Sequence, residues 1–239
     1  MLRAKSEPVA DHGLRTRILV CGHVLTPLPA GALFWEAEGT LIVADLHLEK
    51  GAAMARVGML LPPYDTAVTL KRLASIINSF APRRVVALGD SFHRAELALG
   101  LDLADRAALY ALQQGREWYW ILGNHDPELP RSVGGIVCAA LTVCGITLRH
   151  EPSATASAHE IAGHLHPVAR IARRGEAIRR KCFATDGHRL VMPAFGAYTG
   201  GLNVLDDAFG SLFLRRTLEA WMLGKSEVYP IGARALLPD

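Results

Sequence analysis

Five short polar clusters, each directly behind an apolar run, constrain the fold of this chain more than any other feature. The apolar runs are typical of strands, and the clusters hold aspartate, asparagine and histidine, often with glycine in front. The clusters are Asp45-Leu-His47, Gly89-Asp90-Ser-Phe-His93, Gly123-Asn124-His125-Asp126, His150 and Gly163-His164-Leu-His166. Loops behind the strands of an α/β sheet converge at one rim, so we expect these side chains to meet there.

The rest of the chain indicates an α/β fold. Strand-like runs at 41–44, 85–88 and 118–122 alternate with helical periodicity over 64–80 and 103–113. The later part predicts a buried strand pair in the uncharged stretch 132–148, and strands at 146–149, 160–163, 182–185, 189–192 and 202–205. We therefore predict one α/β (α+β-like) domain over residues 1–239, with two packed sheets, helices outside, and a flexible segment at 1–15.

Composition narrows the class of protein. Half of the residues are hydrophobic and 21% are charged, which predicts a sizeable core and excludes wholesale disorder. The N-terminus lacks the apolar region of a signal peptide and no uncharged stretch is long enough to span a bilayer, so we expect a cytoplasmic protein without a membrane partner. The four cysteines form no C-x-x-C pair, which excludes a zinc ribbon and predicts reduced, mostly buried thiols.

The chemistry of the clusters favours metal binding. Carboxylates, imidazoles and one amide oxygen suit a divalent ion such as Mn²⁺, Fe²⁺ or Zn²⁺, and the lack of thiolates argues against a structural zinc site. A single Asp-x-His or His-x-His pair is usually accidental, but six of the ten histidines fall in these clusters. Glycines before Asp90, Asn124 and His164 permit sharp turns and close approach of backbone. The five clusters together therefore predict a metal site.

In these residues the chain resembles the calcineurin-like metallophosphoesterases, whose pattern is D-x-H, GD-x-x-[DH], GNH[DE], H and GH-x-H. The resemblance covers residues 45–166 and implies a four-layer α/β/β/α sandwich of two mixed sheets with two divalent metal ions. It implies that the first metal is held by Asp45, His47 and His166, the second by Asn124, His150 and His164, with Asp90 as the bridge.

The same resemblance assigns catalytic roles to three further side chains. His125 matches the catalytic histidine of the family, and Asp126 follows it in a position to orient it. His93 matches a variant found in the SbcD-type DNA nucleases, where the equivalent histidine faces the scissile phosphate. The implied roles are protonation of the leaving group or stabilisation of the phosphoryl oxygens.

Four further segments resemble a narrower group, the DNA-ligase-associated metallophosphoesterases. These segments are Ala44–Gly51, Leu61–Thr66, Leu148–Pro152 and Pro193–Gly201. Members of the group are manganese-dependent phosphodiesterases that act as single-strand DNA endonucleases and are encoded beside a repair helicase and a ligase. The resemblance therefore implies Mn²⁺ as the cofactor, single-stranded DNA as the substrate, a role in DNA repair, and a functional association with a ligase and a helicase.

A basic run behind the last cluster is the candidate for substrate binding. Arg170, Arg173 and Arg174 begin four residues after His166 and could guide a polyanionic strand past the metals, and Arg56 lies in the loop after the first cluster. A solvated hairpin with outward charges explains the run as well, and such runs are common. Trp118 and Trp120 could stack on bases, but the apolar strand around them favours core packing.

Two other functions stay open at this point. The first is a phosphatase or phosphodiesterase that acts on nucleotides or another small phosphate ester, because the residues of the metal site do not distinguish such substrates from DNA. The second is a binding scaffold that retains the fold without catalysis. The presence of every metal position of the pattern argues against the scaffold.

Overall fold

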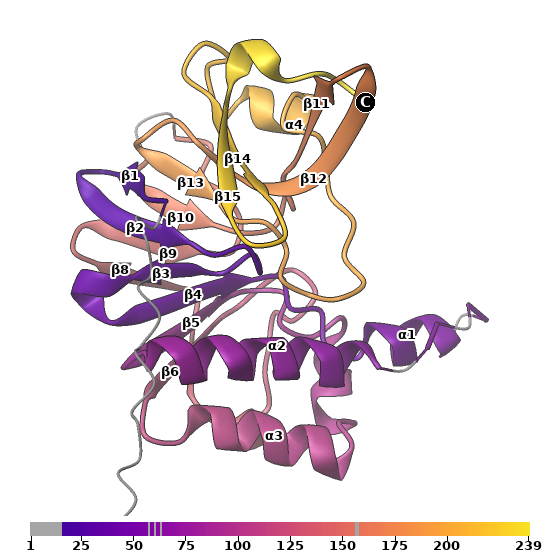
Figure 1. The fold of residues 1–239 in the computed structure, drawn as a ribbon. Helices are drawn as coiled ribbons and strands as arrows, with labels where there is room; N and C mark the ends of the chain where they lie inside the picture. Colours follow the sequence, from indigo (N-terminus) through magenta and orange to yellow (C-terminus); the bar gives the residue numbers. More distant parts are fainter. Residues whose placement is uncertain (1–15, 57, 60, 63, 156–157) are drawn as a thin grey trace, which may run out of the picture.

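Two mixed β-sheets pack face to face (Figure 1). The computed structural model describes residues 16–239 except 57, 60, 63 and 156–157, so the predicted flexible segment 1–15 lies outside the described residues. Neighbouring strands of the first sheet are antiparallel from β1 to β4 and parallel from β4 to β7. Its strands are β1 (Ile18–Val20), β2 (His23–Pro27), β3 (Leu33–Trp35), β4 (Thr40–Ala44), β5 (Arg84–Leu88), β6 (Glu117–Ile121) and β7 (Ile136–Cys138).

The second sheet has the order β15-β14-β12-β13-β10-β9-β8, with β11 paired to β12. Within it, β9, β10 and β13 are parallel neighbours, and the other pairs are antiparallel. Its strands are β8 (Ala140–Val143), β9 (Ile146–Arg149), β10 (Glu160–Ala162), β11 (Val168–Arg173), β12 (Glu176–Thr185), β13 (Arg189–Val191), β14 (Glu219–Leu223) and β15 (Val228–Gly232).

Helices cover the outer faces of the two sheets unequally. On the first sheet lie α2 (Asp65–Phe80) and α3 (Leu103–Gln113), while α1 (Lys50–Arg56) projects from the body (Figure 1). On the second sheet the cover is the short α4 (Asp207–Gly210) together with loops. The 3₁₀ segments are η1 (Glu36–Glu38), η2 (Ala95–Leu99), η3 (Arg131–Val133) and η4 (Ala233–Ala235). The predicted fold class is therefore confirmed, with a fourth layer that is small.

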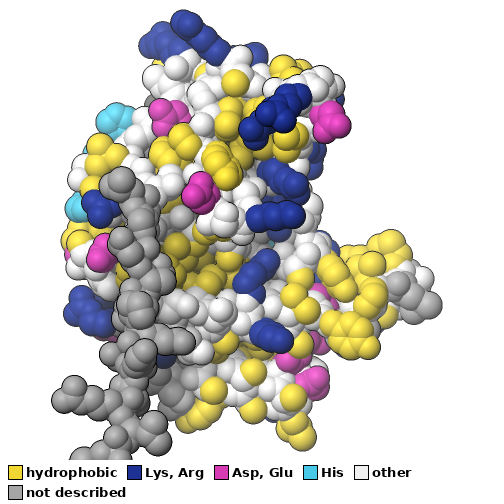
Figure 2. All heavy atoms as spheres, viewed as in Figure 1, with side chains coloured by type: hydrophobic (Ala, Val, Ile, Leu, Met, Phe, Trp, Pro, Cys, Tyr) yellow, Lys and Arg dark blue, Asp and Glu magenta, His cyan; other side chains and the backbone are white. Residues whose placement is uncertain are grey.

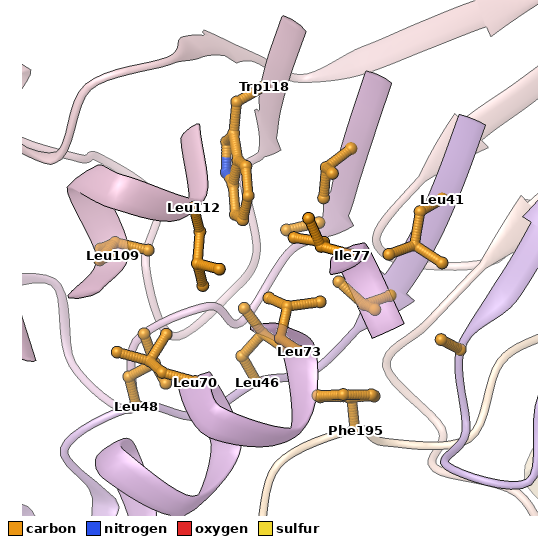
Figure 3. Packing of buried hydrophobic residues seen from close by; sticks show 14 of the residues in the cluster. Leu41, Leu46, Leu48, Leu70, Leu73, Ile77, Leu109, Leu112, Trp118 and Phe195 are labelled. Atoms are coloured by element: carbon orange, nitrogen blue, oxygen red, sulfur yellow. The ribbon is translucent and has the colours of Figure 1, made fainter. Parts of the chain in front are cut away.

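The hydrophobic core consists of three clusters, one between each pair of neighbouring layers. One hydrophobic cluster joins the facing sides of the two sheets, and another joins α4 and its loops to the second sheet. The third fills the space between the first sheet and the helices, where Leu70, Leu73 and Ile77 of α2 share one face at helical spacing (Figure 3). Trp118 and Trp120 belong to this cluster with 2% and 0% of their surface exposed, which confirms core packing and excludes base stacking.

The structure corrects three local predictions. Residues 202–205 form no strand, because Asn203 makes a turn by accepting the backbone N–H of Leu205 (3.0 Å), and only an isolated bridge joins Asn203 to Val168. The stretch 132–148 is split between the sheets: β7 joins the first and β8–β9 the second, and β7 is largely exposed. The four cysteines are free as expected, but only Cys182 is buried.

Across the described part of the chain, no helix combines the length and the apolar character needed to cross a bilayer.

Candidate metal centre

The polar clusters meet because the strands in front of them end at one rim. β4, β5 and β6 are parallel neighbours in the first sheet, and β9 and β10 are parallel neighbours in the second. β4, β5 and β10 are short runs with nearly all side chains buried, the pattern of a strand that is covered on both faces, while β6 and β9 also carry half-buried positions. The side chains that follow these strand ends therefore converge between the two sheets.

Asp45, His47 and His166 form the first donor group, in which one ligand atom from each lies within 4.8 Å of the others. The Nε2 atoms of His47 and His166 are 3.4 Å apart, and His166 Nε2 is 3.4 Å from Asp45 Oδ1. The Asp45 carboxylate also accepts the backbone N–H of His164 at 3.0 and 3.1 Å, which ties the two sheets together at this point.

Asp90, His150 and His164 form the second donor group, again within 4.8 Å. His164 Nδ1 lies 3.1 Å from His150 Nε2, and Asn124 Oδ1 lies 2.9 Å from the same nitrogen. Asp90 links the two groups: its Oδ1 is 3.4 Å from His150 Nε2, and its Oδ2 is 3.9 Å from His47 Nε2. All seven predicted ligands thus lie close together at this rim.

The donor set fits divalent cations. Burial, and then the neighbouring His166, lower the pKa of His47 to about 2, so its imidazole is neutral and keeps a lone pair for a metal. Burial also lowers the pKa of His164. Two pairs of ring nitrogens face one another at 3.1 and 3.4 Å, beside buried carboxylates. A bound cation would stabilise lone pairs and negative charge gathered at this spacing. His150 Nδ1 lies 3.0 Å from the Leu88 carbonyl; a ring N–H donated there leaves Nε2 free for the metal.

Backbone strain is concentrated at the same place. Few non-glycine residues in proteins adopt positive φ, because Cβ then crowds the backbone, and strained residues cluster at functional sites. Five of the seven predicted ligands have positive φ, namely Asp45 (53°), His47 (43°), Asp90 (45°), His164 (71°) and His166 (48°). The surrounding fold therefore holds these side chains in directions that an unstrained backbone would not give.

Two glycines show why the clusters need them. A Cβ at Gly89, which has φ of 69°, would come within 2.4 Å of the His150 ring. A Cβ at Gly123 would come within 2.3 Å of the backbone nitrogen and Oδ1 of Asp90. Neither neighbour can withdraw without leaving the donor groups, so the close approach predicted from the sequence is confirmed at both positions.

His125 and His93 lie together beside the first donor group. Their rings stack with centroids 5.1 Å apart, and both rings, with that of His47, form a third group of nitrogens within 4.8 Å. His125 Nδ1 is 3.0 Å from the carbonyl oxygen of His93, and His125 Nε2 is 3.9 Å from Asp90 Oδ2. The His125 side chain is 40% exposed, so it faces the open side of the centre, where a substrate would arrive. Burial, and then His125, lower the pKa of His93.

Asp126 does not orient His125, which corrects the prediction. Its carboxylate is fully buried and accepts the backbone N–H groups of Asp90 (3.0 Å), Ser91 (2.7 Å), Phe92 (3.1 Å) and Gly123 (3.0 Å). The turn at Gly123 sends this side chain inward, while the His125 ring points outward to the His93 carbonyl. Burial raises the pKa of Asp126 to about 6, while the N–H bonds favour its charged form. Asp126 is therefore a positioning residue for the loop that carries Asp90.

Replacing Asp126 by asparagine should lower the stability of the protein more than a typical surface change. An amide group offers one oxygen and turns an NH₂ toward backbone N–H donors, so at least one buried donor is left unsatisfied at a cost of about 1–3 kcal/mol. We expect urea unfolding to show this loss, with a smaller loss for Asp102→Asn on the exposed start of α3. An unchanged unfolding midpoint for Asp126→Asn would contradict the role given to this carboxylate.

The predicted substrate-binding arginines lie in different surroundings. Arg56 is exposed at the end of α1. Arg170 donates to the carbonyl of Pro238 (2.7 Å), so its guanidinium is engaged with the C-terminal segment. Arg173 and Arg174 lie exposed at the tip of the β11–β12 hairpin. None of the four belongs to a donor group.

Two supports of the centre were not anticipated from the sequence. Lys181 Nζ donates to Ala194 O (2.9 Å) and Thr199 Oγ1 (2.6 Å), and holds a loop whose Gly196 N–H binds the Asp45 carbonyl (3.1 Å). The second support is the buried pair of Arg189 and Glu160 (2.8 Å), whose side chains bind the backbone of Ser153, just after His150. No local pattern marks these residues, because their partners lie far away in the sequence.

A family model and a solved structure agree with this geometry. The family model described as calcineurin-like phosphoesterase matches residues 40–168, more than half of the chain and the range that holds the whole centre. Among solved structures, the nuclease MPE of Pseudomonas putida is 26% identical, covers 90% of this chain and 99% of its own, and has a TM-score of 0.71. The phosphoesterase Yfce of E. coli is 13% identical, with coverage of 81% and 98% and a TM-score of 0.42.

A comparison with curated proteins gives no match. The family match, the two mixed sheets and the donor groups at their common rim nevertheless lead to one assignment. The chain belongs to the calcineurin-like phosphoesterase family and is a metal-dependent hydrolase of phosphate esters.

Proposed function

We propose that this protein is a two-metal phosphodiesterase that cuts single-stranded DNA with Mn²⁺ as its cofactor. The observation that carries the proposal is the pair of donor groups joined by Asp90, whose two carboxylate oxygens face opposite groups. In the proposed site Asp45, His47 and His166 would hold the first cation, Asn124, His150 and His164 would hold the second, and Asp90, which contacts both donor groups, would serve both cations.

The reaction divides between the cations and the side chains. When bound, two divalent cations activate water and neutralise charge on the phosphate. Asp90 is fixed for its bridging role by the His125 backbone N–H, which donates to Oδ1 (2.9 Å). With Nδ1–H of His125 donated to the His93 carbonyl, Nε2 faces the centre, and in the doubly protonated imidazolium form of the ring it is the atom that gives a proton to the leaving oxygen. His93, stacked on His125, is the second candidate for contact with the phosphate.

Single-stranded DNA is favoured by two observations. The nuclease MPE of Pseudomonas putida shares the fold over 90% of this chain, which supports a nucleic acid substrate. The exposed cations of the β11–β12 hairpin add a surface that attracts a polyanion. The segments shared with the DNA-ligase-associated group support Mn²⁺ and a place in DNA repair beside a ligase and a helicase.

Metal removal and replacement test this proposal. Protein stripped with a chelator should neither cut circular single-stranded DNA nor hydrolyse bis(4-nitrophenyl) phosphate, and Mn²⁺ should restore both reactions better than Mg²⁺, which binds imidazole poorly. Mn²⁺ at 100 times its dissociation constant should also stabilise the folded state by about 2.7 kcal/mol for each occupied site, which thermal unfolding reports independently of activity.

The possible results separate the alternatives. Cutting of a circle establishes endonuclease action, because a circle offers no ends. Hydrolysis of the small ester without any cutting of DNA would favour a phosphatase or phosphodiesterase acting on nucleotides or another small ester. Activity that survives complete chelation would overturn the metal-dependent mechanism.

A further inference from the structure

A groove runs along strand β12, and one end of it is bordered by a loop that packs on the metal centre. This end is a hollow of about 400 Å³ bordered by Arg180, Thr199 and Gly200. The loop that supplies Thr199 packs directly on the metal ligands, since the Gly196 N–H binds the Asp45 carbonyl and a Cβ at Gly201 would lie 2.2 Å from the His166 carbonyl oxygen. Lys181 anchors the same loop from β12.

A second hollow, an apolar cleft of similar volume, about 400 Å³, neighbours the first. Arg180 and Leu223 border both hollows, so the two lie side by side. The strand register explains the residues that line this cleft. Ile178, Arg180 and Cys182 share one face of β12, because side chains two residues apart lie on the same face. Cys182 pairs with Met222 of β14, and Met222 pairs with Tyr229 of β15. Tyr229 is 49% exposed, so its ring forms an open wall of the cleft.

The charge of the cleft rim is positive. Arg173 and Arg180 both border the cleft, and no side-chain hydrogen bond or ion pair of either is found among the described residues. Arg179, in contrast, is neutralised by two hydrogen bonds to Asp239, at 2.9 and 3.1 Å. Glu176, opposite Arg173 in the register, is the acid of the hairpin. Figure 2 shows Lys and Arg side chains spaced along this face, beside hydrophobic surface over β14 and β15.

We propose that this groove binds the single strand next to the scissile phosphate, with a base in the apolar cleft against Tyr229 and phosphates on Arg180 and Arg173. This inference rests on the proposed DNA substrate and goes beyond it by naming the path of the strand. A base with a free face fits an open aromatic wall, and flanking guanidiniums match the phosphates on either side of it. Duplex DNA does not offer unstacked bases, so the groove selects single strands.

Equilibrium binding of a fluorescent oligothymidylate series to the Mn²⁺-loaded protein tests the groove. Phosphorothioate linkages slow cleavage, and electrophoresis after each measurement checks that the strand is still intact. For strands long enough to extend from the metal centre into the cleft, Tyr229→Ala should weaken binding about tenfold, which corresponds to the loss of one stacked base. The Kd of Tyr229→Phe should stay within about twofold of the wild-type value. The double variant Arg173→Ala/Arg180→Ala should lower the slope of log Kd against log salt by about 1.4, the effect of two phosphate contacts on a single strand.

Matched controls keep the interpretation clear. The double variant Arg131→Ala/Arg215→Ala removes the same charge from exposed positions outside the groove and should keep the wild-type salt slope. Unchanged thermal unfolding of Tyr229→Ala shows that a loss of binding is not a loss of fold, and rescue by phenylalanine shows that the ring itself matters. Losses should grow with strand length, because only a long strand reaches the cleft.

Failure of the groove and failure of the proposed function give different results. If the wild-type protein cuts circular single-stranded DNA but the groove variants bind every strand as the wild type does, the groove is wrong and the DNA substrate stands. A similar weakening in the Arg131→Ala/Arg215→Ala control also overturns the groove, since it indicates only general charge attraction. If the wild-type protein neither cuts nor binds single-stranded DNA, the DNA substrate falls and the groove with it.

Discussion

Replacing Asp90 by asparagine should reduce kcat/KM for bis(4-nitrophenyl) phosphate by more than about 100-fold. Loss of a residue that only supports a metal ligand commonly lowers metal affinity or activity by about 10–100-fold. A larger loss is expected for Asp90, because it is itself in contact with both donor groups. Asparagine keeps the size of the side chain but removes its charge and replaces one oxygen by an NH₂ group, which repels a cation. The carboxylate can therefore serve two cations, whereas the amide can serve one at most.

The measurement should include the metal as well as the rate. Titration calorimetry with Mn²⁺ should show two binding events in the wild-type protein and a weakened or missing event in Asp90→Asn. The matched control is Asp207→Asn, the same chemical change at an exposed position of α4, which should leave both quantities unaltered. Near-normal turnover of Asp90→Asn with two intact binding events would remove Asp90 from the bridging role.

Replacing His125 by alanine should affect substrates according to their leaving groups. A positioned general acid contributes about 10²–10⁴-fold when the leaving oxygen needs a proton. Hydrolysis of an alkyl phosphodiester, such as a DNA linkage, should fall by that factor, while a nitrophenyl ester should lose less than about tenfold, since nitrophenolate leaves without protonation. The expected difference follows from His125 Nε2, which faces the open side of the centre near Asp90.

The pattern of loss distinguishes acid catalysis from metal binding. Ring nitrogens of His125, His47 and His93 lie within 4.8 Å of one another, close enough to share a metal ion. If His125 only held a metal, its loss would slow the hydrolysis of both classes of ester equally. The ratio of kcat/KM for the two esters is therefore the decisive quantity, rather than either value. His188→Ala, which removes an exposed histidine stacked on His159 outside the centre, is the control and should leave the ratio unchanged.

The sequence was most informative where structure is local. The strand–cluster junctions at Ala44–Asp45 and Leu88–Gly89 were predicted because a fully covered strand is a continuous apolar run and a polar loop must follow it. The helix over 103–113 was likewise predicted with the bounds that α3 has, and in the structure Asp102 caps its first turn by accepting the N–H of Asp105 (2.7 Å). The short strands β1–β3, β14 and β15 were not predicted, because each depends on its neighbours.

The sequence by itself predicted the polar clusters behind the strands and their meeting at one rim, because apolar runs, turns and ligand chemistry are all short-range patterns, and the resemblance to the family supplied the division into ligand sets. Only the tertiary structure decided the direction of Asp126, which turns away from its neighbour His125 to bind backbone 36 residues earlier at Asp90. It also decided that Lys181, in a basic run, faces inward and braces the centre. Such contacts depend on the register and packing of two sheets, which no segment specifies alone.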